Sequence, residues 1–177
     1  MLKFAHYRFA HMSLGQRVAD DGQLVRLLQI GVVLEEVVEA RAAQHFQSLD
    51  ETERAEMDDA IAELLEHAGE ESAEHREQLE ALIEELDAES VPFREVERLV
   101  EAKYGQTRPE DFDDILYDQL HGEETAYKFY DDLIEAIEDS DTEFSVDRER
   151  LLSTLREIRA EEEAGVQEVT ELMEARK

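Results

Sequence analysis

The chain contains no cysteine and no tryptophan, and it has only two prolines and seven glycines in 177 residues. The absence of cysteine excludes disulfides, thiolate metal sites and rubredoxin-type iron centres. The scarcity of proline and glycine leaves long stretches without helix breakers, and residues that favour helices (Ala, Glu, Leu, Arg) dominate. The composition therefore predicts an all-α protein, and the length suits one domain with a substantial core.

Positive charge is also scarce, because 18 basic residues face 48 acidic ones and the formal net charge is -30. Such a charge repels nucleic acid and anionic membranes, so we expect neither as a partner. An acidic surface with few lysines resembles those of proteins from salt-loving microbes, in which molar salt screens the repulsion between charges. Most single glutamates are therefore expected to be solvated on the surface.

Long hydrophobic runs are missing as well. The most apolar run, residues 30–34, is far too short to span a membrane. The N-terminus lacks the unbroken apolar stretch of a signal peptide. These features predict a soluble, cytoplasmic protein, and residues 1–21 show no pattern that assigns them to an element.

Apolar residues recur at steps of three and four in four long segments. These segments are residues 22–49, 50–86, 109–137 and 145–175. The steps predict amphipathic helices packed in a bundle. Short links join the first helix to the second and the third to the fourth, whereas residues 87–108 form a longer crossover with a short helix that ends at Gly105. We therefore expect two helical hairpins joined by one long crossover, in a single domain over residues 1–177.

Two predicted helix starts carry capping signals. Thr107, Pro109 and Glu110 combine a capping side chain, a first-turn proline and a glutamate three residues after the cap. Ser145 is another candidate N-cap, at the start of the fourth helix. These signals set the expected boundaries of the second hairpin.

Polar residues interrupt the inward stripes at one level only. They are Glu39, Ser72 with His75, Glu123 and Glu162. Glu39 and Glu123 each precede apolar residues at offsets of three, seven and ten, and Glu35 lies one turn before Glu39 on the same side. Buried carboxylates are costly unless they are paired or bind a metal. A cation is the simplest way to neutralise three carboxylates around one imidazole, and these ligands suit iron or manganese.

Two stretches that surround these glutamates, "GEETAYKFYDDL" and "VEARAAQHFQSL", resemble the helices that offer bridging glutamates in rubrerythrin-type di-iron carboxylate proteins of the ferritin-like superfamily. The resemblance covers residues 22–175. It implies a ferritin-like four-helix bundle with one long crossover, which holds iron (di-iron or mononuclear) or manganese. It also implies an oxidoreductase acting on peroxide or oxygen, or an iron-binding protein, in a homo-oligomer. Without a rubredoxin centre, electrons would come from an external donor.

The ligand pattern of that family is only partly present. It needs one glutamate from each of two helices, which Glu39 and Glu123 match, and a Glu-x-x-His motif from each of the other two. Ser72 stands where one motif has its glutamate, and Gly165 stands where the other has its histidine. Glu71, four residues before His75, is the candidate replacement for Ser72. The predicted metal ligands are Glu39, Glu71, His75, Glu123 and Glu162.

A second reading stays open. The substitutions at Ser72 and Gly165 favour a non-enzymatic helical bundle whose metal site has decayed, which holds no cofactor and acts as an interaction or structural protein. The retained glutamates favour the metal-binding reading, because a decayed site would fill with apolar residues. The remaining histidines of the helices, His45, His67 and His121, are expected at the surface.

The charge generates a testable prediction about salt. We expect the free energy of unfolding to rise as salt increases from about 0.1 M to above 1 M, where the Debye length falls to about 3 Å and screens the repulsion between carboxylates. Thermal melts across a sodium chloride series measure the effect. A melting temperature that stays constant or falls would contradict this prediction.

Overall fold

The computed structural model describes residues 18–47, 49–92, 94–96, 98 and 112–177. Throughout this part of the chain the regular structure is helical and contains no strand, which confirms the predicted all-α class. Four helices have 27 residues each: α1 (Asp21–Gln47), α3 (Asp59–Glu85), α5 (Phe112–Glu138) and α6 (Arg148–Glu174). A fifth, α2 (Glu51–Glu56), is a short helix between α1 and α3.

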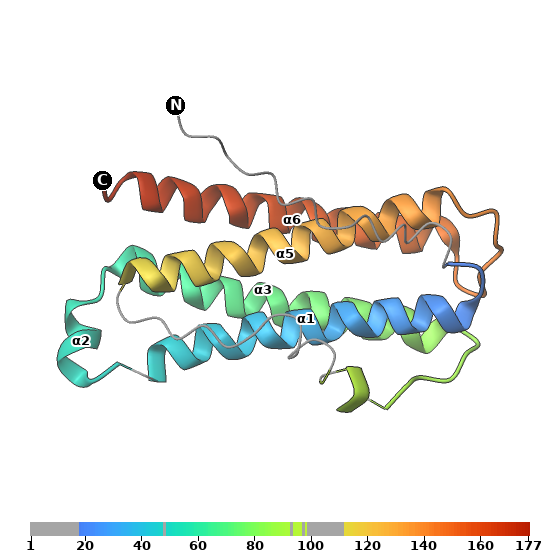
Figure 1. Cartoon of the computed structure of the whole chain (residues 1–177), viewed down its shortest axis with the longest axis horizontal. Helices are drawn as coiled ribbons and strands as arrows, with labels where there is room; N and C mark the ends of the chain where they lie inside the picture. The colour runs from blue at the N-terminus through green and yellow to red at the C-terminus, as the bar shows by residue number, and fades with distance from the viewer. Residues whose placement is uncertain (1–17, 48, 93, 97, 99–111) are drawn as a thin grey trace.

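The four long helices lie side by side (Figure 1). α1 packs mainly on α3 and α5 mainly on α6, while α1 also contacts α5 and α3 also contacts α6. α1 and α6 run in one direction, and α3 and α5 run in the opposite direction. Because α3 and α5 are parallel, the end of α3 and the start of α5 lie at opposite ends of the molecule. The chain between them therefore crosses the length of the helices.

Only part of that crossover is described. Residues 94–96 and 98 are helical, in agreement with a short helix in this crossover. Its predicted end at Gly105 and the predicted start of the third long helix at residues 107–110 lie outside the described residues, as do residues 1–17.

The second helix was predicted over residues 50–86 without a break, and this boundary is wrong. The Asp50 side chain accepts a hydrogen bond from the backbone of Glu53, and the Glu53 side chain accepts one from the backbone of Asp50, which forms a capping box at the start of α2. Met57 is then extended, and the Asp58 side chain caps α3 by accepting from the Ala60 N–H. Two successive caps thus divide the predicted helix into α2 and α3.

The predicted N-cap of the fourth helix is also wrong. The Asp147 side chain accepts from the backbone N–H of Arg150 and caps α6, which begins at Arg148. The Ser145 hydroxyl instead donates to Asp21 at 2.5 Å and accepts from the backbone N–H of Asp87 at 2.8 Å. Ser145 therefore joins the start of α1 to the segment after α3.

Buried apolar side chains of the described residues form three clusters, and polar residues separate the two larger ones. One cluster includes Leu28, Leu79, Tyr130, Leu133 and Leu155, and the other includes Ala42, Ile61, Leu65, Leu116 and Val169. On every long helix, buried polar residues lie between these clusters. We call this set, Glu35, Ser72, His75, Glu123 and Glu162, the polar layer. The apolar stripes that the sequence predicts are thus interrupted at one level of the interior.

None of the described helices combines the length and the apolar character needed to cross a membrane.

Candidate metal centre

Three residues of the polar layer bring ligand atoms together near the middle of the helices. Glu35 comes from α1, His75 from α3 and Glu162 from α6, and all three are at least 95% buried. The His75 Nδ1 atom lies 3.1 Å from Glu162 Oε1 and 3.5 Å from Glu35 Oε1. One ligand atom from each residue falls within 4.8 Å of the others, so the triad Glu35, His75 and Glu162 could hold a metal ion.

The second ring nitrogen of His75 has its own carboxylate partner. Nε2 lies 2.6 Å from Glu161 Oε2, whose side chain is about half exposed. If Nε2 carries the proton and donates to Glu161, the lone pair of Nδ1 is directed toward Glu35 and Glu162. A carboxylate that fixes the tautomer of a ligating histidine in this way is a general feature of metal sites.

Glu35 is also held by Tyr130 of α5. The fully buried Tyr130 hydroxyl donates to Glu35 Oε1. Burial and the neighbouring Glu35 carboxylate raise the pKa of Tyr130 well above its ordinary value, so the phenol stays a neutral donor. The other oxygen, Glu35 Oε2, is buried and has no hydrogen-bond partner among the groups that the structure describes. A buried carboxylate oxygen without a partner is costly, and a cation beside it would remove that cost.

Glu123 of α5 borders the triad without belonging to it. Its Oε1 atom accepts a hydrogen bond of 2.6 Å from the Gln119 side chain, and a further hydrogen bond joins Glu123 to Glu162. Burial raises the pKa of Glu123, whereas these two hydrogen bonds oppose the increase. Glu123 and Glu162 are therefore not both ionised near neutral pH.

Protons neutralise the triad in the absence of a metal. Burial, which outweighs the opposing hydrogen bond from His75, raises the pKa of Glu162 to about 10. Burial lowers the pKa of His75, but hydrogen bonds to Glu162, Glu35 and Glu161 together with the charge of Glu35 raise it to about 11. Near neutral pH the buried carboxyls are thus stabilised by protons on Glu162 and His75. A divalent cation would displace those protons on binding.

Glu71 lines a small cavity together with Glu123. Burial raises the pKa of this half-buried carboxyl to about 7, against the opposing charge of His75. The cavity has a volume of about 40 Å³, and its lining includes Glu71, Glu123, Glu161 and Gly165. It is large enough for a molecule of the size of water.

Gly165 explains how Glu123 reaches this position. A Cβ atom at residue 165 would lie 2.7 Å from the Glu123 Cδ atom and closer still to one of its oxygens. The resemblance expects a histidine at this position of α6, but the Glu123 carboxyl occupies the space instead. The departure of the sequence from the family pattern is thus matched by a different packing of the neighbouring glutamate.

Glu39 is not brought to the triad, and Glu35 occupies the place expected for it. The Glu39 side chain is 37% exposed and pairs with Arg76 at 2.6 Å, at the outer seam between α1 and α3. The helical stripe itself was read correctly, because Glu35 and Glu39 differ by one turn. The sequence offers two signals for the inner glutamate: the apolar run 30–34 that precedes Glu35, and the arginine that follows His75.

The other sequence expectations have mixed outcomes. His75, Glu123 and Glu162 are buried at one level as predicted, with Ser72 beside them. His67 and His121 are exposed as expected, but His45 is buried, and its Nε2 atom lies 3.1 Å from Asp118 of α5. Asp118 also accepts a hydrogen bond from Arg41. The expectation for His45 is therefore wrong, because His45 joins α1 to α5 instead of lying at the surface.

Comparisons with family models, with curated proteins and with solved structures find no match for this chain. The residues of the triad, their surroundings and the packing of the helices are therefore the observations from which a function can be argued.

The raised pKa values predict how pH affects the metal-free protein. Stability from a group with a raised folded-state pKa is complete below its unfolded value and is lost as pH rises toward the folded value. For Glu162 this window runs from 4.5 to about 10, and for His75 from 6.5 to about 11. Denaturant unfolding at constant salt with a chelator, between about pH 7 and 9.5, should show a fall on the order of a few kcal/mol.

The control for the pH prediction is Glu162→Gln, whose amide mimics the protonated carboxyl and cannot ionise. Its free energy of unfolding should depend less steeply on pH than that of the unchanged protein. Equal slopes for the two proteins would show that Glu162 does not titrate in this window.

A second prediction concerns the space at Gly165. Gly165→Ala should destabilise the protein by about 1–2 kcal/mol, because the new methyl group displaces Glu123 from its hydrogen bonds. Gly69→Ala is the matched control: its Cβ would meet only the Ala42 Cβ, at 4.0 Å, so the helix should gain up to about 1 kcal/mol. Urea unfolding measures both. In a Glu123→Ala background the cost at residue 165 should disappear, and an unchanged cost would contradict the clash.

Proposed function

We propose that this protein has a ferritin-like fold and binds one transition-metal ion through Glu35, His75 and Glu162. The observation that carries the proposal is the buried Glu35 Oε2 atom, which has no partner within the described part of the chain and lies beside an imidazole and a second carboxyl. Two antiparallel hairpins, joined by a chain that crosses the length of the helices, support the ferritin-like assignment.

The donor set favours iron or manganese. Two carboxylates and one imidazole are hard and intermediate ligands, which suit Mn²⁺ and Fe²⁺ better than metals that prefer thiolate. Bound iron would supply one-electron chemistry toward peroxide or oxygen, with electrons from an external donor. Glu161 would hold the tautomer of His75, Tyr130 would hold the orientation of Glu35, and the small cavity beside Glu123 would admit only molecules near the size of water.

The proposal is a mononuclear site rather than the di-iron site of the resembling family. Ser72 and Gly165 remove two of the six ligands of that pattern, and the space at Gly165 is taken by Glu123. A second ion would need Glu71 and Glu123, which line the small cavity. The measured stoichiometry distinguishes one ion from two.

The second candidate is a helical protein without a cofactor, in which the polar layer is satisfied by protons. The observation that favours it is the set of protein hydrogen bonds already made by His75, whose ring nitrogens face Glu162 and Glu161. In that case the layer would serve to specify how the helices pack rather than to bind a ligand.

The test is a calorimetric titration of the chelator-treated protein with Mn²⁺, and with Fe²⁺ under anaerobic conditions. We expect about one equivalent to bind, and His75→Gln or Glu35→Gln should weaken binding by about a hundredfold or more. Glu161→Gln should weaken it by about 10- to 100-fold, because the tautomer of His75 is then less well fixed. Glu39→Gln is the matched control, since that carboxylate lies outside the triad, and it should leave the affinity unchanged.

Two outcomes would decide against the metal site. If neither ion binds, or if Glu39→Gln and Glu35→Gln have equal effects, the second candidate is favoured. In that case Glu35→Gln should also raise the free energy of unfolding, because a buried carboxylate with an unpaired oxygen is removed. A stoichiometry near two would favour the di-iron reading instead.

A further inference from the structure

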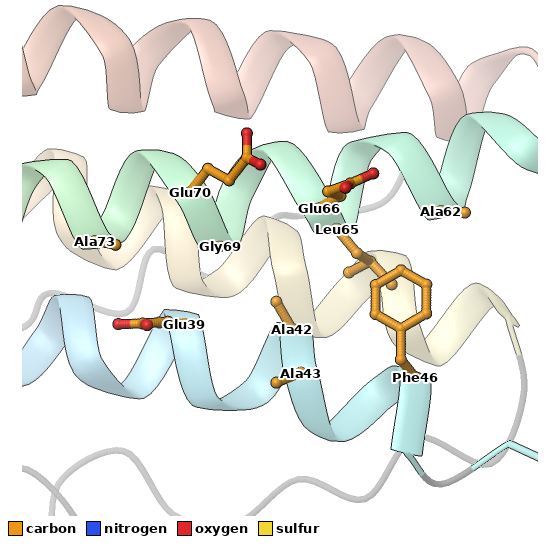
Figure 2. Close-up of a pocket in the computed structure, with 10 residues that line it drawn as sticks. All are labelled: Glu39, Ala42, Ala43, Phe46, Ala62, Leu65, Glu66, Gly69, Glu70 and Ala73. Carbon is orange, nitrogen blue, oxygen red and sulfur yellow. The ribbon is translucent and has the colours of Figure 1, made fainter.

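A groove runs along the outer seam between α1 and α3, on the side of the molecule where Glu39 lies. Its volume is about 590 Å³. Apolar and small residues line it, namely Ala42, Ala43, Phe46, Ala62, Leu65, Gly69 and Ala73, together with the carboxylates of Glu39, Glu66 and Glu70 (Figure 2). In Figure 2 the Phe46 ring and the Leu65 side chain lie between the two helices, and the three glutamates lie along them. The groove thus combines an apolar floor with an acidic rim.

The N-terminal arm, which we define as residues 1–17, has the opposite character. It contains Lys3, Arg8 and Arg17 but no aspartate or glutamate, although the whole chain has 48 acidic residues. The first carboxylate of the chain is that of Asp20. Apolar and aromatic residues alternate with these basic ones: Leu2, Phe4, Tyr7, Phe9, Met12 and Leu14. The arm is therefore a basic, aromatic segment in a strongly acidic protein.

We propose that the N-terminal arm binds in this groove of its own chain, with its apolar side chains on the floor and its basic side chains at the acidic rim. Opposite charge favours this occupant, because Lys3 and Arg8 would meet Glu66, Glu70 and Glu39. The same groove of a second copy is a poor occupant, because two acidic rims would face each other in a chain with a net charge of -30.

The arm is long enough to reach the groove. It is followed by Val18, which is buried and whose carbonyl accepts a hydrogen bond of 2.7 Å from the Ser140 hydroxyl. With a helical rise of about 1.5 Å per residue, Glu39 and Phe46 lie roughly 27–38 Å beyond the start of α1. An extended segment from Val18 to Phe4 covers roughly 46 Å, so the region around Phe4 can lie over the floor.

Carbodiimide coupling of the full-length protein tests this directly, because the reagent joins a lysine to a carboxylate only when the two are in contact. The chain has four lysines, and Lys3 is the one within the arm. We expect peptide mapping to show Lys3 joined mainly to Glu66, Glu70 or Glu39. The pair Lys128 and Asp132, at 2.9 Å, supplies an internal positive control for a folded protein.

Isotope labelling and one matched pair of variants complete the experiment. In an equal mixture of ¹⁴N- and ¹⁵N-labelled chains, the Lys3 products should contain one isotope only. Glu66→Lys should reduce coupling of Lys3 to Glu70 by about fivefold. Glu157→Lys makes the same charge change on an exposed residue of α6 and should leave that coupling unchanged. The Lys128 product should stay constant in both variants.

Three results would overturn the proposal. Coupling of Lys3 spread over acidic residues of α5 and α6 would place the arm elsewhere. Coupling of Lys103 to the rim would assign the groove to the crossover. Products with mixed isotopes would assign it to the arm of a neighbouring chain.

Discussion

The interior of this protein depends on how three carboxyls and one imidazole can be buried together in one layer between the two larger apolar clusters. Glu35, Glu123 and Glu162 cannot all be ionised side by side, because burial weakens the screening of their charges. The structure resolves the conflict with protons, with the Tyr130 hydroxyl and with the Gln119 amide, and one oxygen of Glu35 remains unpartnered in the described chain. The position of Tyr130, the glycine at residue 165 and the partner of His75 all follow from this constraint.

Much of the architecture can be read from the sequence, because helical stripes are a direct record of burial. The buried residues Ile61, Leu65, Ala68, Ser72, His75, Leu79 and Leu82 of α3 follow the steps of three and four that predict the helix. The helix boundaries are harder to predict from the sequence, since several acidic residues near each helix start could act as the N-cap. The carboxylates of Asp58 and Asp147 cap α3 and α6, whereas the Ser145 hydroxyl donates a hydrogen bond to Asp21 at the start of α1. A local pattern cannot reveal that a side chain has a better partner more than a hundred residues away.

The sequence predicts that buried polar residues of the four long helices meet in one layer, but it does not predict every ligand of the candidate site. His75 and Glu162 follow from the stripes, whereas choosing Glu35 over Glu39 requires knowing that Arg76 pairs with the outer glutamate. Glu161 lies outside the inward stripe of α6 and is about half exposed, yet its long side chain reaches the Nε2 atom of His75. Gly165 was read as a missing ligand. Gly165 also leaves space for the Glu123 side chain. This effect depends on how closely α5 approaches α6, and the pattern of one helix alone does not predict that distance.

The pairing of the helices has a consequence for how the molecule assembles and opens. Helices α1 and α3 can dock as one local unit and α5 and α6 as another, since each pair is nearly contiguous in the chain. The bonds from Glu35 to Tyr130 and from His75 to Glu162 exist only after these units meet, and they span 95 and 87 residues of sequence. Long-range contacts of this kind form late in folding, because closing the chain between them costs entropy. On unfolding, the two helix pairs would therefore separate from each other before either pair comes apart. The hydrogen bonds of the polar layer connect the two pairs and oppose this separation.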